Sequence, residues 1–174
     1  MKKQKADPIK NKKKRGEWVE LKFMAEAAER NLPASKPLGD SEHFDVVVGR
    51  TGKFVGVQIK SVTHRSANGE GYLAPVRNSK GPYPAGAFDF IAVYVVPENV
   101  WYILPAKEIL GMRSVSLCTP ACRWEKYREA WKSLQEAVGL TQEESSQIEE
   151  SIAPNRMESR MMGAFNSVRR HWER

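Results

Sequence analysis

Apolar residues recur at three- and four-residue steps near the start of the chain, which predicts an amphipathic helix beginning at Gly16. Its expected apolar face consists of Trp18, Leu21, Ala25 and Ala28. Pro33 disfavours a helical conformation at the residue before it, so the helix is expected to end near Asn31.

Short runs of β-branched and aromatic residues predict a sheet in the middle of the chain. The expected strands are Phe44–Val48, Phe54–Ser61, Tyr72–Val76, Phe88–Val96 and Val100–Leu104. Glycines in the segment 49–53 predict that the first two strands pair as a hairpin that turns about residues 51–52. The fourth strand is almost continuously apolar, as is typical of a strand buried on both faces. A short helical turn over Ala106–Leu110 is expected after the last strand.

The last third of the chain returns to helical spacing. One helix is predicted over Arg123–Val138 and a final basic helix over Asn155–Trp172. The apolar stripes of these helices are Trp124, Tyr127, Trp131 and Leu134 in the first, and Met157, Met161, Phe165 and Val168 in the second. Each stripe is a candidate surface for packing or for association between copies of the chain.

Length and composition are those of a globular protein with one domain. The chain has 174 residues, of which 41% are hydrophobic and 9% aromatic. A chain of this size can form a core without disulfides or a structural metal. It has no uninterrupted apolar run of about 18 residues, so no membrane association is expected. Because it contains two cysteines, Cys118 and Cys122, and no export signal, we expect free thiols and a cytoplasmic location.

The formal net charge of +7 is concentrated at the N-terminus. Residues 1–15 contain eight basic side chains and one acidic side chain, and the rest of the chain contains 20 of each sign. This segment has little apolar surface to bury, so residues 1–15 are predicted to be a disordered basic tail. Three interpretations of the tail remain open: an arm that binds nucleic-acid phosphates, a solubilising tail, or a start-site or vector-derived artefact.

Polar side chains on the predicted hairpin are the first candidates for catalysis. In a hairpin that turns about residues 51–52, Asp45 falls opposite position 57 or 58, so its carboxylate can adjoin the amide of Gln58. Lys60 shares the face of Gln58, because side chains repeat every two residues along a strand. Glu20, on the predicted first helix, supplies a second carboxylate.

Such a group of side chains suits the hydrolysis of a phosphodiester. Oxygen ligands bind Mg²⁺, and a nearby lysine can orient or deprotonate the attacking water. Each residue also has an ordinary explanation. Glu20 can be a surface acid, Asp45 the start of a strand, and Lys60 an edge lysine that discourages aggregation.

The order of these residues resembles that of the PD-(D/E)XK nuclease superfamily: a helical glutamate, an aspartate on a strand, and a strand with an acidic residue or glutamine two positions before a lysine. The stretches that carry the resemblance are GEWVELKF at 16–23, FDVVV at 44–48 and VQIKS at 57–61. DFIAVY at 89–94 and WYILP at 101–105 add to it. The sequence is most similar to the group I intron homing endonuclease branch and its bacterial relatives, over about residues 16–110.

The resemblance implies an α/β fold of the restriction-endonuclease type, with a mixed β-sheet flanked by helices and with C-terminal helices added. The expected divisions are the tail at 1–15, a nuclease core at 16–111, and a helical extension at 112–174 for oligomerisation or DNA contact. The implied activity is Mg²⁺-dependent cleavage of double-stranded DNA, with Mn²⁺ able to substitute and with no organic cofactor.

The resemblance also implies roles for individual residues. Its catalytic residues would be Glu20, Asp45, Gln58 and Lys60, and its metal ligands Asp45, Gln58 and Glu20. Gln58 stands where the usual residue is acidic, which removes one negative charge and leaves the number of metal ions open. The usual proline–aspartate pair is not adjacent here, and Asp40, which follows Pro37 in the stretch PLGD, is a rival to Asp45. We favour Asp45 because it belongs to the predicted strand.

Basic loops beside the expected sheet are candidates for contact with DNA. They contribute Arg50, Lys53, Arg65, Arg77 and Lys80, interleaved with Tyr72 and Tyr83. Cutting both strands at one place requires two active sites, so a homodimer or homotetramer is expected. Two other functions remain open: a structure-selective nuclease similar to Holliday-junction resolvases, and a DNA-binding module that has lost its metal site.

Three more polar residues, His43, His64 and Asp89, lie near the predicted strands. We interpret the histidines as loop or strand-end residues in preference to proton relays. Asp89 is interpreted as a capping or turn residue, with a structural ion pair near the site as the alternative. The segment Gly49–Lys53 lacks the spacing of a phosphate-binding loop and is interpreted as a turn.

Overall fold

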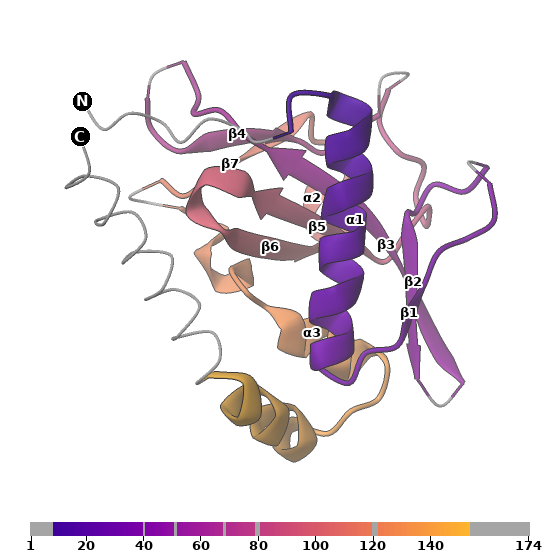
Figure 1. Cartoon of the computed structure of the whole chain (residues 1–174). Coiled ribbons are helices and arrows are strands. Elements are labelled where there is room, and N and C mark those ends of the chain that lie inside the picture. The colour runs from indigo at the N-terminus through magenta and orange to yellow at the C-terminus, as the bar shows by residue number, and fades with distance from the viewer. Residues whose placement is uncertain are drawn as a thin grey trace.

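The computed structural model of the chain describes residues 9–39, 41–50, 52–67, 69–78, 81–119 and 122–153. It contains a five-stranded sheet and a two-stranded sheet, with a long N-terminal helix across the larger one (Figure 1). The predicted helix Asn155–Trp172, with its stripe from Met157 to Val168, lies outside the described residues. Asp40, Lys80 and residues 1–8 of the basic tail also lie outside them.

The N-terminal helix, α1 (Lys12–Glu29), begins before the predicted start at Gly16. Asn11 caps it, because its Oδ1 accepts the backbone N–H groups of Lys13 at 3.0 Å and Lys14 at 3.2 Å. Asparagine at this position satisfies N–H groups that have no partner within the helix. The prediction of a disordered tail is therefore wrong from residue 12 onward.

The buried face of α1 is not the face that the sequence pattern indicated. Val19, Phe23 and Ala27 are buried against the sheet. Three residues of the predicted face are exposed, namely Leu21, Ala25 and Ala28. Both sets have helical spacing, and the Phe23 ring decides between them because it stacks on Trp131 in the core, with ring centroids 5.2 Å apart.

The main sheet has the strand order β1-β2-β3-β5-β6. Its strands are β1 (Ala34–Ser35), β2 (Val46–Arg50), β3 (Lys53–Val62), β5 (Phe90–Val95) and β6 (Val100–Pro105). β3 and β5 run parallel, and the other neighbours run antiparallel. The predicted strands are confirmed with ends shifted by at most two residues. β1 was not predicted, because two residues are too few for an alternating pattern.

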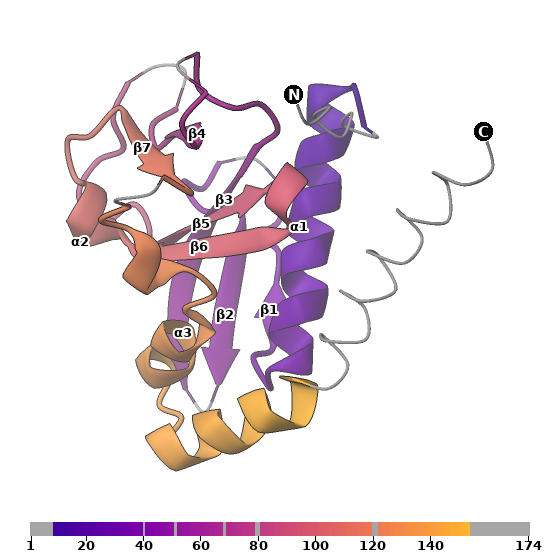
Figure 2. The same ribbon diagram turned by 90° about the vertical axis from the view of Figure 1, so that its left-hand side faces the viewer.

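A second, smaller sheet covers the face of the main sheet opposite α1 (Figure 2). It pairs β4 (Tyr72–Pro75) antiparallel with β7 (Ser114–Leu117). Two short helices flank β6, η1 (Val96–Glu98) before it and α2 (Ala106–Ile109) after it. The predicted extension at 112–174 is therefore not wholly helical, because β7 lies within it and completes a sheet of the core.

The two faces of the main sheet form two separate cores, because successive side chains of a strand point to opposite faces. On the side of α1, β5 and β6 contribute Ala92, Tyr94, Trp101 and Ile103. On the side of β4 and β7, they contribute Ile91, Val93, Val95, Val100, Tyr102 and Leu104. Burial on both faces explains why Phe90–Val95 has no polar residue.

The helix predicted over Arg123–Val138 is divided into η2 (Glu125–Tyr127) and α3 (Trp131–Ala137). Between them, Glu129 has a φ of 52°. Its carboxylate accepts the backbone N–H of Trp101 and the indole N–H of Trp131, both at 3.0 Å. These tertiary hydrogen bonds outweigh the local helical pattern.

The break divides the stripe that was predicted on this segment. Trp124 and Tyr127 pack in the β4–β7 core, whereas Trp131 and Leu134 are buried in the α1 core. The prediction that this stripe is an interface between copies is therefore wrong, because the core of the same chain already covers these side chains.

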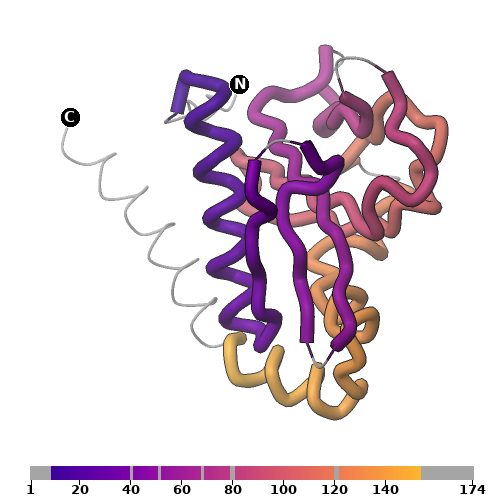
Figure 3. Tube along the Cα trace, turned by 90° about the vertical axis from the view of Figure 1, so that its right-hand side faces the viewer, coloured from indigo at the N-terminus to yellow at the C-terminus, as the bar shows by residue number. Residues whose placement is uncertain are grey.

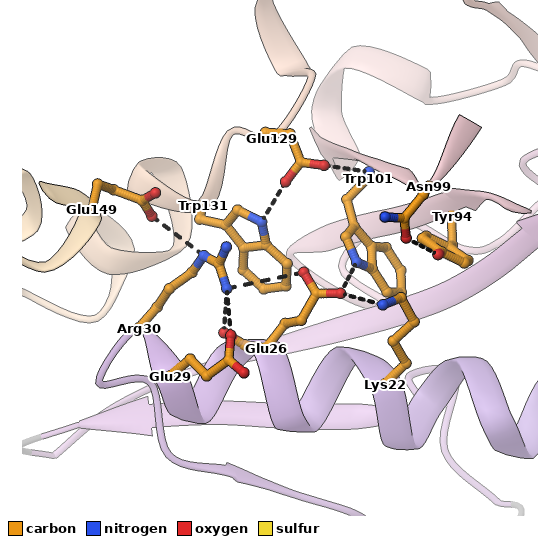
Figure 4. A network of polar contacts seen from close by, with 10 residues as sticks. All are labelled: Lys22, Glu26, Glu29, Arg30, Tyr94, Asn99, Trp101, Glu129, Trp131 and Glu149. Atoms are coloured by element: carbon orange, nitrogen blue, oxygen red, sulfur yellow. Dashed lines mark hydrogen bonds and ion pairs between the residues drawn. The ribbon is translucent and has the colours of Figure 1, made fainter. Parts of the chain in front are cut away.

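A helix over residues 142–153 follows α3 and packs near the end of α1. Arg30, at the C-cap of α1, is fully buried between them. Its guanidinium lies over the Trp131 ring, 4.4 Å from the ring centroid, and its Nε is 3.3 Å from a carboxylate oxygen of Glu149 (Figure 4). The ion pair between Arg30 and Glu149 therefore connects the N-terminal helix to the C-terminal part of the described chain.

The two cysteines are free thiols, as predicted. Burial raises the pKa of the Cys118 thiol, and a raised pKa keeps the thiol protonated and unreactive. None of the helices in the described ranges is long and apolar enough to cross a membrane.

Candidate active site

The candidate active site lies where β2 begins and β3 extends beyond it. The antiparallel ladder runs from the pair Arg50–Lys53 at the turn to the pair Val46–Val57. Asp45 is the next residue, and its N–H donates to the carbonyl oxygen of Val57 at 3.0 Å. Asp45 therefore lies opposite Gln58, and the predicted proximity of these two residues is confirmed.

Two donors from β3 hold the Asp45 carboxylate. The backbone N–H of Ile59 donates to Asp45 Oδ2 at 2.6 Å, and the amide nitrogen of Gln58 donates to the same oxygen. Since β2 does not continue along this part of β3, the carboxylate oxygen takes the place of a strand carbonyl as the partner of Ile59. The side chain of Gln58 is almost completely buried, which fixes its amide beside Asp45.

Charges from three elements act on Asp45. Burial raises the pKa of Asp45 above its usual value, and the hydrogen bond from Ile59 opposes this effect. The charge of Glu20 on α1 raises this pKa further, whereas the charges of Lys60 on β3 and of Lys36 lower it. Asp45 and Gln58 are thus in direct contact, and the charges of Glu20 on α1 and Lys60 on β3 act on Asp45; the catalytic roles of the four residues stay a prediction.

Lys36 is a member of this group that the sequence analysis missed. It follows β1, the edge strand that pairs Ala34 with Val48 and Ser35 with Val47, so it lies beside the start of β2. Its ammonium forms a hydrogen-bonded ion pair with the Glu20 carboxylate, which raises the pKa of Lys36. The register of β1 was needed to find this residue.

Lys60 lies beside an aromatic group from the loop that precedes β5. Its Nζ is 5.7 Å from the centroid of the Tyr83 ring. Tyr83 packs edge-on against Phe88, with centroids 4.9 Å apart, and against His43, with centroids 6.2 Å apart. The site is thus bounded on one side by an aromatic wall, with His43 next to Tyr83.

The donor set fits a magnesium ion that keeps most of its water ligands. No group of three or more histidine, cysteine, aspartate or glutamate side chains within the described ranges could hold a metal ion. Asp45 and Glu20 supply two carboxylates, and Mg²⁺ is commonly bound through one or two carboxylates together with water and phosphate. Gln58 presents its N–H₂ group to Asp45, so it positions that carboxylate in this arrangement.

Two of the predicted DNA-contacting residues lie at the opposite end of the hairpin from Asp45. Arg50 and Lys53 flank the turn, which lies near the helix over residues 142–153 (Figure 3). The Lys53 side chain lies against Gly139, just before this helix. Hydrogen bonds from Thr141 lower the pKa of Glu144 in the helix, and the charge of Arg50 adds to this effect. The structure does not bring this pair to the candidate site.

Of the other predicted basic residues, Arg65 is already paired. Arg65 forms an ion pair with Glu98 at 3.0 Å and lies over the ring of Tyr72, 5.1 Å from its centroid. Arg77 is exposed just after β4. For these residues a role in DNA contact stays a prediction.

Asp89 and His64 have structural contacts. The Asp89 carboxylate accepts the backbone N–H of Gly56 at 2.7 Å, and its own N–H donates to the Gly56 carbonyl oxygen at 2.9 Å. Asp89 thus joins β3 to the start of β5, a structural role that differs from the cap or turn that was predicted. His64 follows β3, and its Nδ1 is 2.7 Å from the hydroxyl of Thr63.

Comparison with known proteins agrees with this geometry. A family model described as PD-(D/E)XK endonuclease matches residues 10–134. The fold is similar to that of a solved bacterial homing endonuclease, I-Ssp6803I, with a TM-score of 0.64 and 26% sequence identity over 72% of this chain and 94% of that chain. No curated protein matches the chain. The resemblance and the restriction-endonuclease-like fold that the sequence predicted are confirmed.

Proposed function

The chain belongs to the PD-(D/E)XK endonuclease family, and on this premise we propose that it is a metal-dependent enzyme that hydrolyses phosphodiester bonds in double-stranded DNA. The observation that carries the proposal is the grouping of Glu20, Lys60 and Gln58 about the half-buried carboxylate of Asp45. The structural similarity to a homing endonuclease supports cleavage at a specific DNA site.

In this proposal, Asp45 and Glu20 hold the divalent cation. When bound, Mg²⁺ lowers the pKa of a coordinated water and offsets negative charge on the phosphoryl group. The N–H groups of Ile59 and Gln58 keep the Asp45 carboxylate in place, so little reorganisation accompanies binding. Both donors share one carboxylate oxygen of Asp45, Oδ2.

Lys60 is the electrostatic partner of the reaction in its ammonium form, whereas only its deprotonated amine could act as the general base. Its ammonium extends from the same face of β3 as Gln58, two residues along the strand. From there it can orient the attacking water and offset the charge that develops on the phosphate. The Tyr83 ring limits the positions that the lysine can take.

We further propose that the active protein is a homodimer or homotetramer, since two strands require two active sites. The stripe from Trp124 to Leu134 does not supply this interface, because Trp124, Trp131 and Leu134 are buried in the chain's own cores and Tyr127 packs against one of them.

The test is cleavage of supercoiled plasmids that carry randomised inserts, in Mg²⁺, in Mn²⁺ and in a chelator. We expect cutting with either cation and none with the chelator. Asp45→Asn and Lys60→Ala should each reduce the rate by about 100-fold or more, the scale expected when a group that stabilises the transition state is lost.

Asp40→Asn is the matched control, because it changes the rival carboxyl of the stretch PLGD. It should cut at the wild-type rate, and cutting that depends on Asp40 but not on Asp45 would overturn the site. A four-way DNA junction included as a second substrate tests the resolvase alternative. Binding to both DNAs without cutting under any condition would indicate the non-catalytic module.

A further inference from the structure

The ion pair between Lys36 and Glu20 involves one of the two carboxylates that are assigned to the metal ion. The Glu20 carboxylate is one of two acidic groups assigned to the cation, and Lys36 is its direct partner. The Lys36 side chain is 46% exposed and that of Glu20 is 19% exposed, so the pair is partly open to solvent. Lys36 also lowers the pKa of Asp45, so its charge acts on both carboxylates.

The electrostatics of the group explain why a lysine is placed there. Glu20 and Asp45 are like charges that disfavour each other's ionised form, and Asp45 is already disfavoured by burial. The Lys36 ammonium, which pairs with Glu20 and whose charge also acts on Asp45, compensates part of this cost. A divalent cation that binds the same carboxylates supplies the same compensation, and more of it.

We propose that Lys36 is a resident counter-ion of the active site, which pairs with Glu20 before a divalent cation binds and gives up this partner when it does. The inference rests on the proposed function, because it assumes that the cation binds at Asp45 and Glu20. Lys36 thus competes with the metal ion for Glu20. Without metal, the ion pair stabilises the two carboxylates. In the protein without DNA, the same ion pair lowers the affinity of the site for the metal ion.

The competition has an expected sign and size. Removing the ammonium with Lys36→Met leaves Glu20 without its partner, so the cation should bind more tightly. The expected gain is about two- to fivefold in affinity, the scale of a partly exposed ion pair. A merely structural role for Lys36 would give the same affinity or a weaker one.

The experiment is calorimetric titration of Mg²⁺ and Mn²⁺ into the full chain without DNA, at constant ionic strength. Lys36→Met should bind more tightly than wild type, and Lys36→Arg, which keeps the charge, should bind like wild type. Lys22→Met is the matched control, because Lys22 forms another lysine–glutamate pair on α1, with Glu26 at 2.8 Å. It should leave the affinity unchanged.

A second measurement uses thermal unfolding. In a chelator, Lys36→Met should have a lower Tm than wild type, because two carboxylates lose their shared counter-ion. Saturating Mg²⁺ should raise the Tm of this variant more than that of wild type, because a ligand stabilises the folded state according to its affinity.

Asp45→Asn separates failure of this inference from failure of the proposed function. Cation binding that is lost in Asp45→Asn but unchanged or weakened in Lys36→Met would overturn the role of Lys36 alone. Cation binding that persists in Asp45→Asn, or no binding by wild type in either measurement, would overturn the metal site and with it this inference.

Discussion

At the scale of single residues, the site depends on the Asp45 carboxylate, which the fold holds in surroundings that disfavour its ionised form. Asp45 is half-buried, its pKa is raised by that burial, and two N–H donors from β3 fix its position. Partial burial of the ionised carboxylate costs free energy, because the charge loses part of its hydration. A cost of this kind is expected where a charged group serves binding or catalysis.

The raised pKa of Asp45 predicts a stability change with a definite sign. Because the folded state disfavours the ionised form, ionised Asp45 destabilises the fold at neutral pH, and the penalty disappears below the ordinary aspartate pKa of about 3.9. Asp45→Asn, which resembles the protonated form, should therefore raise the Tm at pH 7 in a chelator. The gain should shrink towards zero as the pH falls below 4. A lower Tm at pH 7 would contradict the assignment.

A second prediction concerns Tyr83, whose ring lies beside Lys60. Tyr83→Phe keeps the ring and should cut at close to the wild-type rate. Tyr83→Leu removes the cation–π contact and should lower the cleavage rate about two- to fivefold, since such contacts contribute about 0.5–1 kcal/mol at exposed sites.

A tyrosine elsewhere in the chain provides the control for this series. Tyr127 also lies under a lysine, with Lys126 Nζ at 4.8 Å from the ring centroid, but it packs in the β4–β7 core. Tyr127→Leu should leave the cleavage rate per folded molecule unchanged. Equal losses in both leucine variants would show that general loosening of the structure, and not the position of Lys60, sets the rate.

At the scale of elements, alternation along the chain was enough to predict the hairpin and, through its register, the meeting of Asp45 with Gln58. The helix face and the break at Glu129 were not predictable in this way, because both depend on aromatic packing and hydrogen bonds between distant segments. The same limit applies to Lys36. Its place depends on β1, which is too short for a pattern and is defined by its pairing with β2.

The connection between α1 and the helix over residues 142–153 gives a prediction for stability. Arg30 is fully buried, donates to the Glu26 carbonyl oxygen at 2.6 Å and faces the Glu149 carboxylate and the Trp131 ring. Arg30→Leu should lower the free energy of unfolding by about 2 kcal/mol or more, because it removes the buried guanidinium that contacts the Trp131 ring and pairs with the partly exposed Glu149.

Arg128 is the comparison for Arg30, since it pairs with Glu125 at 2.9 Å but is 40% exposed. Arg128→Leu should cost less than about 1 kcal/mol. Chemical denaturation of the two variants measures the difference. If both variants lose the same free energy, the buried contacts do not hold the C-terminal helix in place.

At the scale of the whole molecule, the main sheet separates two hydrophobic cores that support different parts of the candidate site. The core on the side of α1 includes Phe23, Trp101 and Trp131 and supports the helix that carries Glu20. The core on the other side includes Phe88 and lies behind Tyr83, so it supports the wall next to Lys60. The acidic and basic parts of the site are therefore supported from opposite faces of one sheet.

The hairpin register has a consequence for how such a chain can vary. Twelve residues separate Asp45 from Gln58, and their pairing about a tight turn is what places the two side chains opposite each other. If the turn keeps two residues, one inserted residue would move Asp45 opposite Val57 or Ile59, whose side chains point to the other face. Insertions and deletions in this turn should therefore be tolerated far less than substitutions there. Related nucleases should keep the length of this segment even where its amino-acid sequence differs.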